Sequence, residues 1–545
     1  MKRTFFNTIL APGITMLLLL VYLSGCSKKF DEINTDPSKA SQLDFDPNYL
    51  FTTAQLGYGN VTEYQLYEFS CMTQLFASTF DYYGGGDKYD QQLTAYNTRF
   101  FIDGMTQAAQ LTEAQSLGEK DPEKYHNLSQ LCRIFRVLIM QRITDVYGDI
   151  PYFQAGQGKN GVLYPVYDAQ EAIYKDMLVT LDDAIQKLDA NKPLATGDLL
   201  YAGDIDQWKK FGYSIMLRVA MRLSKVASEL ARQYAEKAAK NTFASIADNA
   251  IVKLEGGPNE ATINRTANAI GLNDFQEIRW SKTFIDYLKS SGDPRLYALT
   301  EKADTGLAYN QSLARPGLRY TTQDPTPTGS LHEVPIGMPN GHDISGAYSI
   351  TTAPGYPGPT GTGDNASPLG NYARPRMDVF TRKNLPVFLV TYSQTELLLA
   401  EAKIRGWDVG AVTAAQHFQN GVQAALQALP QWDAALTIPA DTITQFMSKR
   451  ILDESSPEHS LQMINAEYWA ASIFDFTEAW SNWRRSNYPL LTPVNYPGNI
   501  SDGAIPRRLP YPPTENATNP ANYRIAIRQL GGSDLSSARV WWDKQ

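Results

Sequence analysis

The sequence has few of the residues that cross-link small folds or bind metals. Its 545 residues include three cysteines and five histidines, and no two histidines stand at the spacing of metal ligands. Cys71 and Cys132 lie in apolar, helix-like surroundings, so we expect buried thiols rather than a disulfide framework. A basic excess is also missing, since 57 Asp and Glu outnumber 49 Lys and Arg. The formal charge of −8 therefore argues against a nucleic-acid partner.

The signatures of common catalytic and cofactor sites are absent as well. The chain has no Gly-x-Ser-x-Gly elbow, no His-Glu-x-x-His, no Cys-x-x-Cys, no phosphate loop and no EF-hand loop. The glycine run at 84–86 follows no predicted strand, so it does not indicate a dinucleotide site. We expect no catalytic residue, no cofactor and no metal. A glycoside hydrolase stays open, because that chemistry needs only two suitably spaced carboxylates.

Long apolar runs are confined to the N-terminus. Two basic residues precede an apolar stretch from Ile9 to Leu23, which ends in Leu23-Ser24-Gly25-Cys26. This order predicts a lipoprotein signal peptide at 1–25, with Cys26 lipidated as the first residue of the mature chain. Residues 26–46 are then the lipid anchor and a polar tether. No later run approaches the 18 apolar residues typical of a membrane span, so lipid is the expected attachment.

Helical periodicity dominates residues 47–241 and returns at 388–428. Leu128, Leu131, Phe135 and Leu138 recur at spacings of three and four, and Asp168 with Glu171 resembles a capping box. The sequence therefore predicts a mainly α fold built on a tetratricopeptide-like scaffold, although an irregular helical domain without true repeats stays open. The expected helix pairs are 47–75 with 97–118, 126–147 with 168–190, 206–226 with 228–241, and the hairpin 388–428.

The remaining segments have a different character. Residues 242–385 are predicted to be loop-rich, because 19 of the 55 residues in 316–370 are Gly or Pro. A C-terminal region at 429–545 ends in Trp541 and Trp542, whose rings are expected to hold the chain end against the body. We expect residues 47–545 to form a single body.

Several motifs follow one another in order over essentially the whole mature chain. The motifs are Lys29-Phe30-Asp31-Glu32-Ile33-Asn34-Thr35-Asp36-Pro37, Thr144-Asp145-Val146-Tyr147-Gly148-Asp149-Ile150-Pro151-Tyr152, Tyr201-Ala202-Gly203-Asp204, Leu217-Arg218-Val219-Ala220-Met221-Arg222, Gly292-Asp293-Pro294-Arg295-Leu296, Glu396-Leu397-Leu398-Leu399-Ala400-Glu401-Ala402, Glu478-Ala479-Trp480 with Arg484-Arg485, and Ile505-Pro506-Arg507-Arg508-Leu509-Pro510-Tyr511-Pro512. Taken together, they resemble those of the SusD/RagB family of Bacteroidetes outer-membrane lipoproteins, in its SusD-like branch.

The resemblance implies a location and a role. Such proteins sit lipid-anchored on the outer-membrane surface, cover a SusC-like TonB-dependent transporter, bind a glycan or sometimes a peptide, and are not enzymes. It also implies four tetratricopeptide-like helix pairs and a loop-rich ligand region. The motifs themselves are expected to be structural: Gly148 ends a helix, and Arg218 and Arg222 suit the dipole at a helix C-terminus.

Ligand-binding residues are predicted from the way sugars are recognised, by flat aromatic faces combined with planar polar groups. Adjacent tyrosines in a Gly-rich, Asp-containing loop are the first candidates, and three further aromatics lie in the loop-rich half. The predicted ligand-binding residues are Asp81, Tyr82, Tyr83, Tyr89, Trp280, Tyr348 and Tyr356.

Two other functions fit the same sequence. A surface hydrolase would release products from a polysaccharide, and a purely structural scaffold would bind proteins through its helix pairs without a small ligand.

Overall fold

The computed structural model describes residues 45–544 apart from Val61, Gln92, Asn273 and the segments 303–333 and 360–366. Two compact units divide the chain, Met1–Pro47 and Asn48–Gln545, and the description below concerns the second. The predicted signal peptide, Cys26 and the tether up to residue 44 lie outside the described residues, as does much of the Gly- and Pro-rich run.

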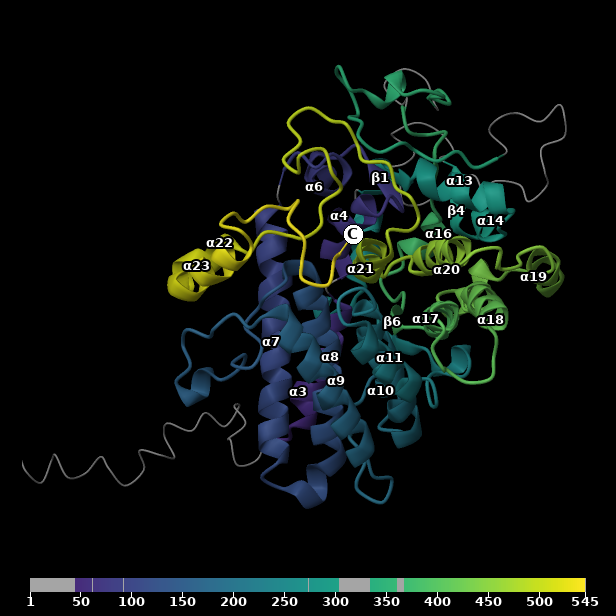
Figure 1. Ribbon diagram of the computed structural model, residues 1–545. Helices are drawn as coiled ribbons and strands as arrows, with labels where there is room; N and C mark the ends of the chain where they lie inside the picture. Colours follow the sequence, from purple (N-terminus) through teal and green to yellow (C-terminus); the bar gives the residue numbers. More distant parts are fainter. Residues whose placement is uncertain are drawn as a thin grey trace, which may run out of the picture. The chain divides into compact units, whose positions relative to one another are not determined.

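Four pairs of packed helices form the scaffold of the described chain (Figure 1). Each predicted pair is present, and consecutive pairs also pack on each other through α7 with α8 and α9 with α10. The predicted segment 47–75 is divided, because α4 (Thr62–Tyr67) and α5 (Phe69–Met72) follow the first helix. The pairs are α3 (Asn48–Gly59) with α7 (Thr94–Gly118), α8 (Pro122–Tyr147) with α9 (Gln170–Lys187), α10 (Ile205–Arg222) with α11 (Ser228–Ala238), and α17 (Tyr392–Ile404) with α18 (Ala414–Gln427).

Local sequence signals explain where these helices begin and end. The Asp121 carboxylate accepts from the Lys124 amide at the start of α8, and Gly148 ends that helix with a φ of 88°. Asp204 caps α10 through the amides of Asp206 and Gln207. This helix ends at Arg222, so the last four residues of the predicted helical segment 206–226 form a turn instead.

The predicted capping box at Asp168 and Glu171 is wrong. Asp168 Oδ2 instead accepts from the amides of Tyr152 and Phe153, both at 2.9 Å, and so closes the loop between α8 and α9. The Gln170 amide at the start of α9 donates to Asp149 Oδ1 at 2.8 Å. The cap is therefore supplied by a residue 21 positions earlier, which a local pattern does not reveal.

The predicted hairpin 388–428 begins later than expected. Val387–Val390 forms strand β6, which pairs antiparallel with β2 (Ala250–Val252). A capping box formed by Thr391 and Gln394 then starts α17. The β-branched Val387 and Val390 suit a strand, so Phe388, the first residue of the predicted hairpin, lies in β6 and not in a helix.

The other described elements are short and surround the scaffold. Among the described residues, three two-stranded antiparallel sheets pair β1 with β3, β2 with β6 and β4 with β5. The predicted loop-rich region 242–385 therefore also carries helices and strands. The remaining elements are β1 (Phe76–Ser78), α6 (Gly84–Asp87), α12 (Arg265–Leu272), β3 (Ile278–Trp280), α13 (Lys282–Ser291), α14 (Arg295–Leu299), β4 (Thr300–Lys302), β5 (Ala373–Pro375), α16 (Met377–Phe380), α19 (Ala440–Met447), α20 (Pro457–Ala471), α21 (Phe476–Ser486), α22 (Pro513–Thr518) and α23 (Pro520–Gln529).

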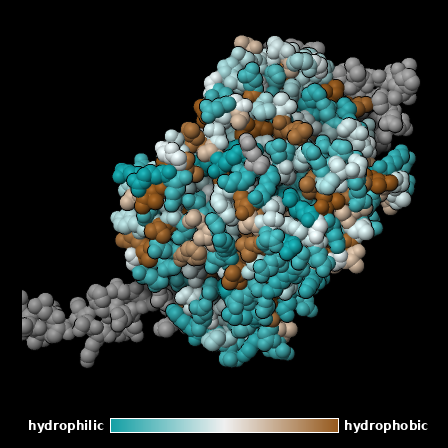
Figure 2. Space-filling view, in the orientation of Figure 1, coloured by the Kyte–Doolittle hydropathy of each residue, from teal (hydrophilic) through white to brown (hydrophobic). Residues whose placement is uncertain are grey.

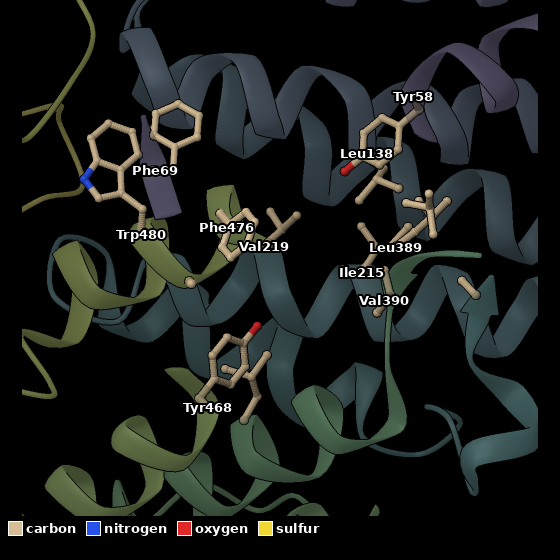
Figure 3. Close-up of a cluster of buried hydrophobic side chains, with 14 of the residues drawn as sticks. Tyr58, Phe69, Leu138, Ile215, Val219, Leu389, Val390, Tyr468, Phe476 and Trp480 are labelled. Carbon is tan, nitrogen blue, oxygen red and sulfur yellow. The ribbon is translucent and has the colours of Figure 1, made fainter. Parts of the chain in front are cut away.

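The core joins the helix pairs to the C-terminal helices. Phe69 of α5 stacks on Trp480 of α21 with ring centroids 4.7 Å apart, and Val219 lies near Phe476 (Figure 3). Trp469 and Trp480 are fully buried in this core. Cys71 and Cys132 are buried free thiols, as expected.

Arginine motifs that carry the family resemblance form buried ion pairs. Arg222 Nη2 lies 2.6 Å from Glu478 Oε2 and 3.2 Å from Asp145 Oδ2, so its partners are carboxylates rather than the helix dipole. Arg485 Nη1 lies 2.5 Å from Glu401 Oε1 and links α21 to α17. At the chain end Trp542 is buried, as predicted, and Asp543 pairs with Arg507. These arginines therefore have a structural role, as expected of their motifs.

Candidate functional site

Three segments from distant parts of the chain meet at one end of the scaffold. Residues 79–90, 334–359 and 487–512 lie together there, beside β1 and α6 (Figure 1). The contacts that join them include the Ile500 amide donating to the Tyr89 carbonyl at 2.7 Å and an ion pair between Lys88 and Asp343. On the face shown in Figure 2, apolar residues form small separate patches in a mostly hydrophilic surface.

Tyr348 and Tyr496 form a pair of rings at this end, called here the tyrosine pair. Their ring centroids are 5.2 Å apart with an interplanar angle of 54°. Tyr348 is 44% exposed and Tyr496 is half-buried. The Tyr496 hydroxyl donates to Asp343 Oδ2 at 2.8 Å. Burial, this hydrogen bond and the nearby charges of Asp90 and Asp81 raise the pKa of Tyr496 to about 12, so the hydroxyl stays protonated at neutral pH.

The buried side chain of Lys88 contacts both Asp343 and the Tyr496 ring of the tyrosine pair. The Lys88 ammonium lies 2.8 Å from Asp343 Oδ1 and 5.6 Å from the centre of the Tyr496 ring. Asp343 is itself fixed by its backbone, because its amide donates to the Tyr348 carbonyl and its carbonyl accepts from Ile350. The geometry of the pair is therefore set by an ion pair and a tight loop, which favours a preorganised surface.

Asp87 connects this loop to strand β1. Its carboxylate accepts from the Ser78 amide at 3.1 Å, from Asn340 Nδ2 at 2.6 Å and from the Gly341 amide at 2.7 Å. Burial raises the pKa of Asp87 to about 6, although the three donors oppose the shift. The Asp87 carboxylate thus links the segment 340–343 to β1, in addition to the Lys88–Asp343 ion pair.

The predicted glycine-rich loop is a single helical turn, α6, whose glycines are buried. Ahead of it Phe80 stacks on Tyr82 with centroids 5.0 Å apart. The hydroxyls of Tyr82 and Tyr83 both donate to the buried Asp274 carboxylate, that of Tyr83 at 2.8 Å. Tyr82 stays half-buried and Asp81 is exposed, whereas Tyr83 is fully covered.

The structure brings only some of the predicted binding residues to the surface. Tyr89 is 1% exposed and Trp280 is 0% exposed. Trp280 donates to the Leu299 carbonyl at 3.2 Å and packs on Phe76, so neither face of its ring reaches solvent. Tyr356 is half-buried, and its hydroxyl donates to the Pro368 carbonyl at 2.8 Å. Of the predicted residues, Asp81, Tyr82, Tyr348 and Tyr356 keep exposed surface, and Tyr348 belongs to the tyrosine pair.

Sequence reasoning did not find Tyr496 or Lys88. Tyr496 lies in an irregular run before Pro497 and Gly498. This context predicts a loop, but it does not show which residues the loop contacts. Lys88 was adjacent to a predicted residue, yet nothing in the local sequence shows that it is buried against Asp343.

The site offers stacking faces and polar side chains. Exposed aromatic rings and carboxylates suit a polar ligand with apolar C–H faces, whereas the buried Lys88 ammonium and the Asn340 amide are bonded within the protein. Within the described ranges, no group of three or more His, Cys, Asp or Glu side chains is arranged to hold a metal ion. None of the helices in the described part of the chain is long and apolar enough to cross a membrane.

The four helix pairs define a helical-scaffold fold, and its loop-built end presents the tyrosine pair. The family model described as starch-binding and associating with the outer membrane matches residues 38–324 and 346–512. The chain therefore belongs to this SusD-like family, as the sequence motifs predicted.

Solved structures agree with the family assignment. A chitin-binding protein is 27% identical, with a TM-score of 0.76, over 92% of this chain and 100% of the other. The SusD-like protein of Bacteroidetes AC2a is 24% identical with a TM-score of 0.79, over 92% and 100% of the two chains. A chitin-binding SusD homolog from Flavobacterium johnsoniae is 22% identical with a TM-score of 0.69, over 92% and 99%. No curated protein sequence matches this chain.

Proposed function

We propose that this chain is a surface-exposed, nutrient-binding lipoprotein that captures a glycan at the tyrosine pair. The observation that carries the proposal is the exposed Tyr348 ring beside Tyr496, held in place by Lys88 and Asp343. A ring face that is fixed before binding loses little entropy when a sugar packs against it. The family description as starch-binding supports a glycan over a peptide.

In this proposal the neighbouring polar groups determine which sugars bind. Asp81 and Asp90 add carboxylates that accept from hydroxyl groups, and the exposed part of Tyr82 extends the aromatic surface along the Phe80 stack. The bound glycan is then passed to a SusC-like TonB-dependent transporter, and lipid on Cys26 holds the protein at the outer membrane. The protein binds without catalysis.

Calorimetric titration tests the binding step. The soluble chain beginning at Ser27 is titrated with starch and chitin oligosaccharides and with peptides, beside the double variant Tyr348→Ala, Tyr496→Ala. We expect saturable glycan binding that weakens at least about tenfold in the variant, since about 1.4 kcal/mol of stacking is lost. Tyr164→Ala is the matched control, because Tyr164 is 65% exposed in the loop between α8 and α9.

Other outcomes would overturn parts of the proposal. Equal binding by the double variant would place the site elsewhere, and binding of peptides alone would replace the glycan. Oligosaccharide products in the titration mixture would indicate a hydrolase. The anchor is tested by mass spectrometry of the membrane-extracted protein, where an unmodified Cys26 would contradict it. Copurification with a TonB-dependent barrel tests the partner.

A further inference from the structure

The cations around the tyrosine pair are all buried. Three segments meet at this end of the scaffold, residues 79–90, 334–359 and 487–512, and together they contain one lysine and two arginines. Each of these cations is buried and has a carboxylate partner. The pairs are Lys88 with Asp343, Arg507 with Asp543, and Arg508 with Asp534. The one histidine of these segments, His342, is half-buried, and burial lowers its pKa, so its ring is uncharged at physiological pH.

Several carboxylates of the same segments remain at the surface. Asp81 and Asp502 are exposed, and Asp90 is half-buried. In the part of the chain that the structure describes, none of these three carboxylates belongs to an ion pair. Asp502 Oδ2 accepts from the Ser537 hydroxyl at 3.2 Å, a bond that leaves its charge uncompensated. The three segments therefore expose negative charge and bury positive charge.

Two of these charges act on the tyrosine pair. Burial and the hydrogen bond to Asp343 raise the pKa of Tyr496, and the charges of Asp90 and Asp81 add to the shift. The Lys88 ammonium balances the charge of Asp343 at 2.8 Å, but no second cation of these segments balances Asp81 and Asp90. A negative potential therefore surrounds the exposed part of the pair.

The surface of the helix pairs α7 to α9 has a different arrangement, because its carboxylates lie beside exposed lysines. The ion pairs there are Lys159 with Glu113, Lys175 with Glu171, Lys187 with Asp183, and Lys192 with Glu123. Lys282, whose amide donates to the Met338 carbonyl, is exposed next to the tyrosine end but is itself paired with Asp286. A surface of mixed charges exerts little net field, whereas the three segments around the tyrosine pair expose carboxylates only.

A field of one sign distinguishes ligands by their charge. The ring faces of Tyr348 and Tyr496 pack against the C–H side of a sugar whether or not the sugar is charged, so they provide affinity without this distinction. A uronate or sulfate group beside the exposed carboxylates meets a like charge and loses affinity. A protonated amino group gains affinity there, because it donates to a carboxylate and is attracted by its charge.

From these observations we propose that Asp81 and Asp90 are specificity-determining residues of the tyrosine pair, which select amino-sugar glycans over neutral ones and exclude acidic ones. The inference rests on the proposed function, because it concerns ligands that are captured at this pair. It adds a substrate class: a glycan that carries protonated amino groups.

Calorimetric titration with three hexasaccharides tests this order. The probes are a glucosamine oligomer, its N-acetylated counterpart and a glucuronate oligomer, in mildly acidic buffer that keeps the amines protonated. We expect the affinity of the wild-type protein to fall in that order. In Asp81→Asn the preference for the amine over the N-acetylated ligand should drop at least about threefold, the size expected of one exposed charge pair. At about 1 M salt, where the Debye length is about 3 Å, the preference should largely disappear.

The matched control is Asp408→Asn, which removes an exposed carboxylate in the loop between α17 and α18. This variant should keep the wild-type preference at low salt. Both substituted side chains are exposed, so we expect the two variants to fold like the wild-type protein.

The potential at Tyr348 is measured without any glycan. In protein labelled with 3-fluorotyrosine, Tyr348→Phe assigns the fluorine resonance, and a cationic and an anionic nitroxide are added in turn. We expect the cationic nitroxide to broaden this resonance more than the anionic one, with a smaller difference in Asp81→Asn. Equal or greater broadening by the anionic nitroxide would overturn the inference.

The titration separates this inference from the proposed function. Binding that is lost in the double variant Tyr348→Ala, Tyr496→Ala but shows no preference by charge, or a preference that Asp81→Asn leaves unchanged, would overturn the inference alone. Equal or tighter binding of the glucuronate oligomer would do the same. Binding that survives in the double variant, or no binding of any hexasaccharide, would overturn the inference together with the proposed capture at the tyrosine pair.

Discussion

Two buried carboxylates of the helical core differ from two at the loop-built end, the region formed by residues 79–90, 334–359 and 487–512 together with the adjacent Glu68. In the scaffold, Glu401 and Glu478 face arginines, and the pKa of each carboxyl is lowered because those charges outweigh the effect of burial. At the loop-built end, burial raises the pKa of Glu68 to about 7 and that of Asp87 to about 6. An arginine partner keeps a buried carboxylate ionised and joins two helices. Glu68 and Asp87 lack such a partner, so their protonation changes closer to neutral pH.

The largest expected effect comes from breaking the scaffold pairing. Glu401→Gln leaves Arg485, buried between α17 and α21, without its carboxylate partner. We expect the free energy of unfolding to fall by about 3–5 kcal/mol, because an uncompensated buried charge remains. Urea titration followed by circular dichroism measures it.

The control for this variant is an exposed ion pair. Glu171→Gln removes the partner of Lys175 on the surface of α9 and should change stability by less than about 1 kcal/mol. A similar small loss in Glu401→Gln would show that the buried pair contributes little.

The second effect is a pH dependence confined to the loop-built end. Glu68 has a folded pKa of about 7 against 4.5 for the free group, so its contribution to stability is complete below 4.5 and is lost as pH rises through 7. Between about pH 8 and pH 5 the local gain is on the order of 3 kcal/mol. Glu401 behaves in the opposite way, since its lowered pKa keeps its contribution until pH falls well below 4.5.

Hydrogen exchange checks this contrast. After correction for the intrinsic exchange rate, amides of α5 and α6 should be more protected at about pH 5 than at about pH 8, whereas those of α17 should not change. Glu68→Gln should reduce the difference, and the part that remains comes from Asp87 of α6, whose raised pKa acts in the same direction. Equal pH responses in both regions would contradict the assignment to Glu68.

The third effect compares two helical glycines. A Cβ on Gly86 would meet backbone atoms of Glu68, with its carbonyl carbon at 2.9 Å, whereas a Cβ on Gly104 would meet the end of the Ile143 side chain. Gly86→Ala should lower stability by about 1–3 kcal/mol, because the backbone must shift.

Gly104→Ala should be closer to neutral. Its side-chain neighbour can move, and alanine favours a helix by about 1 kcal/mol over glycine. Thermal unfolding of both variants measures the difference. The same loss in both would mean that Gly86 has more room than its contacts with Glu68 indicate.

The smallest expected effect on stability is that of Tyr348→Ala. The ring is 44% exposed, so we expect a change within about 0.5 kcal/mol in the unfolding free energy, together with weaker glycan binding. Calorimetry and thermal unfolding on the same sample separate the two readouts. A large stability loss would mean that Tyr348 supports the loop rather than the ligand.

Much of the scaffold could be predicted because its signals are local. The Leu128, Leu131, Phe135 and Leu138 stripe became a buried face of α8, and the expected helix pairs are all present. The errors concern helix boundaries that are set by a residue distant in the sequence. Asp149 caps the start of α9, and pairing with β2 makes residues 387–390 a strand. A pattern within one segment cannot show a partner elsewhere in the chain.

The binding site was less predictable for the same reason. Adjacent tyrosines suggested an exposed surface at 82–83, yet the hydroxyl of Tyr83 is bound to Asp274, 191 residues later, and the ring is covered. Trp280 had no sequence feature that distinguished a core ring from a binding ring. The Tyr496 partner of Asp343 is 153 residues away in the chain.

The sequence by itself determined the mainly helical scaffold, the family likeness and the expectation of a lipid anchor, because helical periodicity, caps and ordered motifs are encoded by near neighbours. Only the tertiary structure decided which aromatic rings reach the surface and which carboxylates meet an arginine. Burial and pairing depend on segments that lie far apart in the chain, and their geometry is set when the core closes around them.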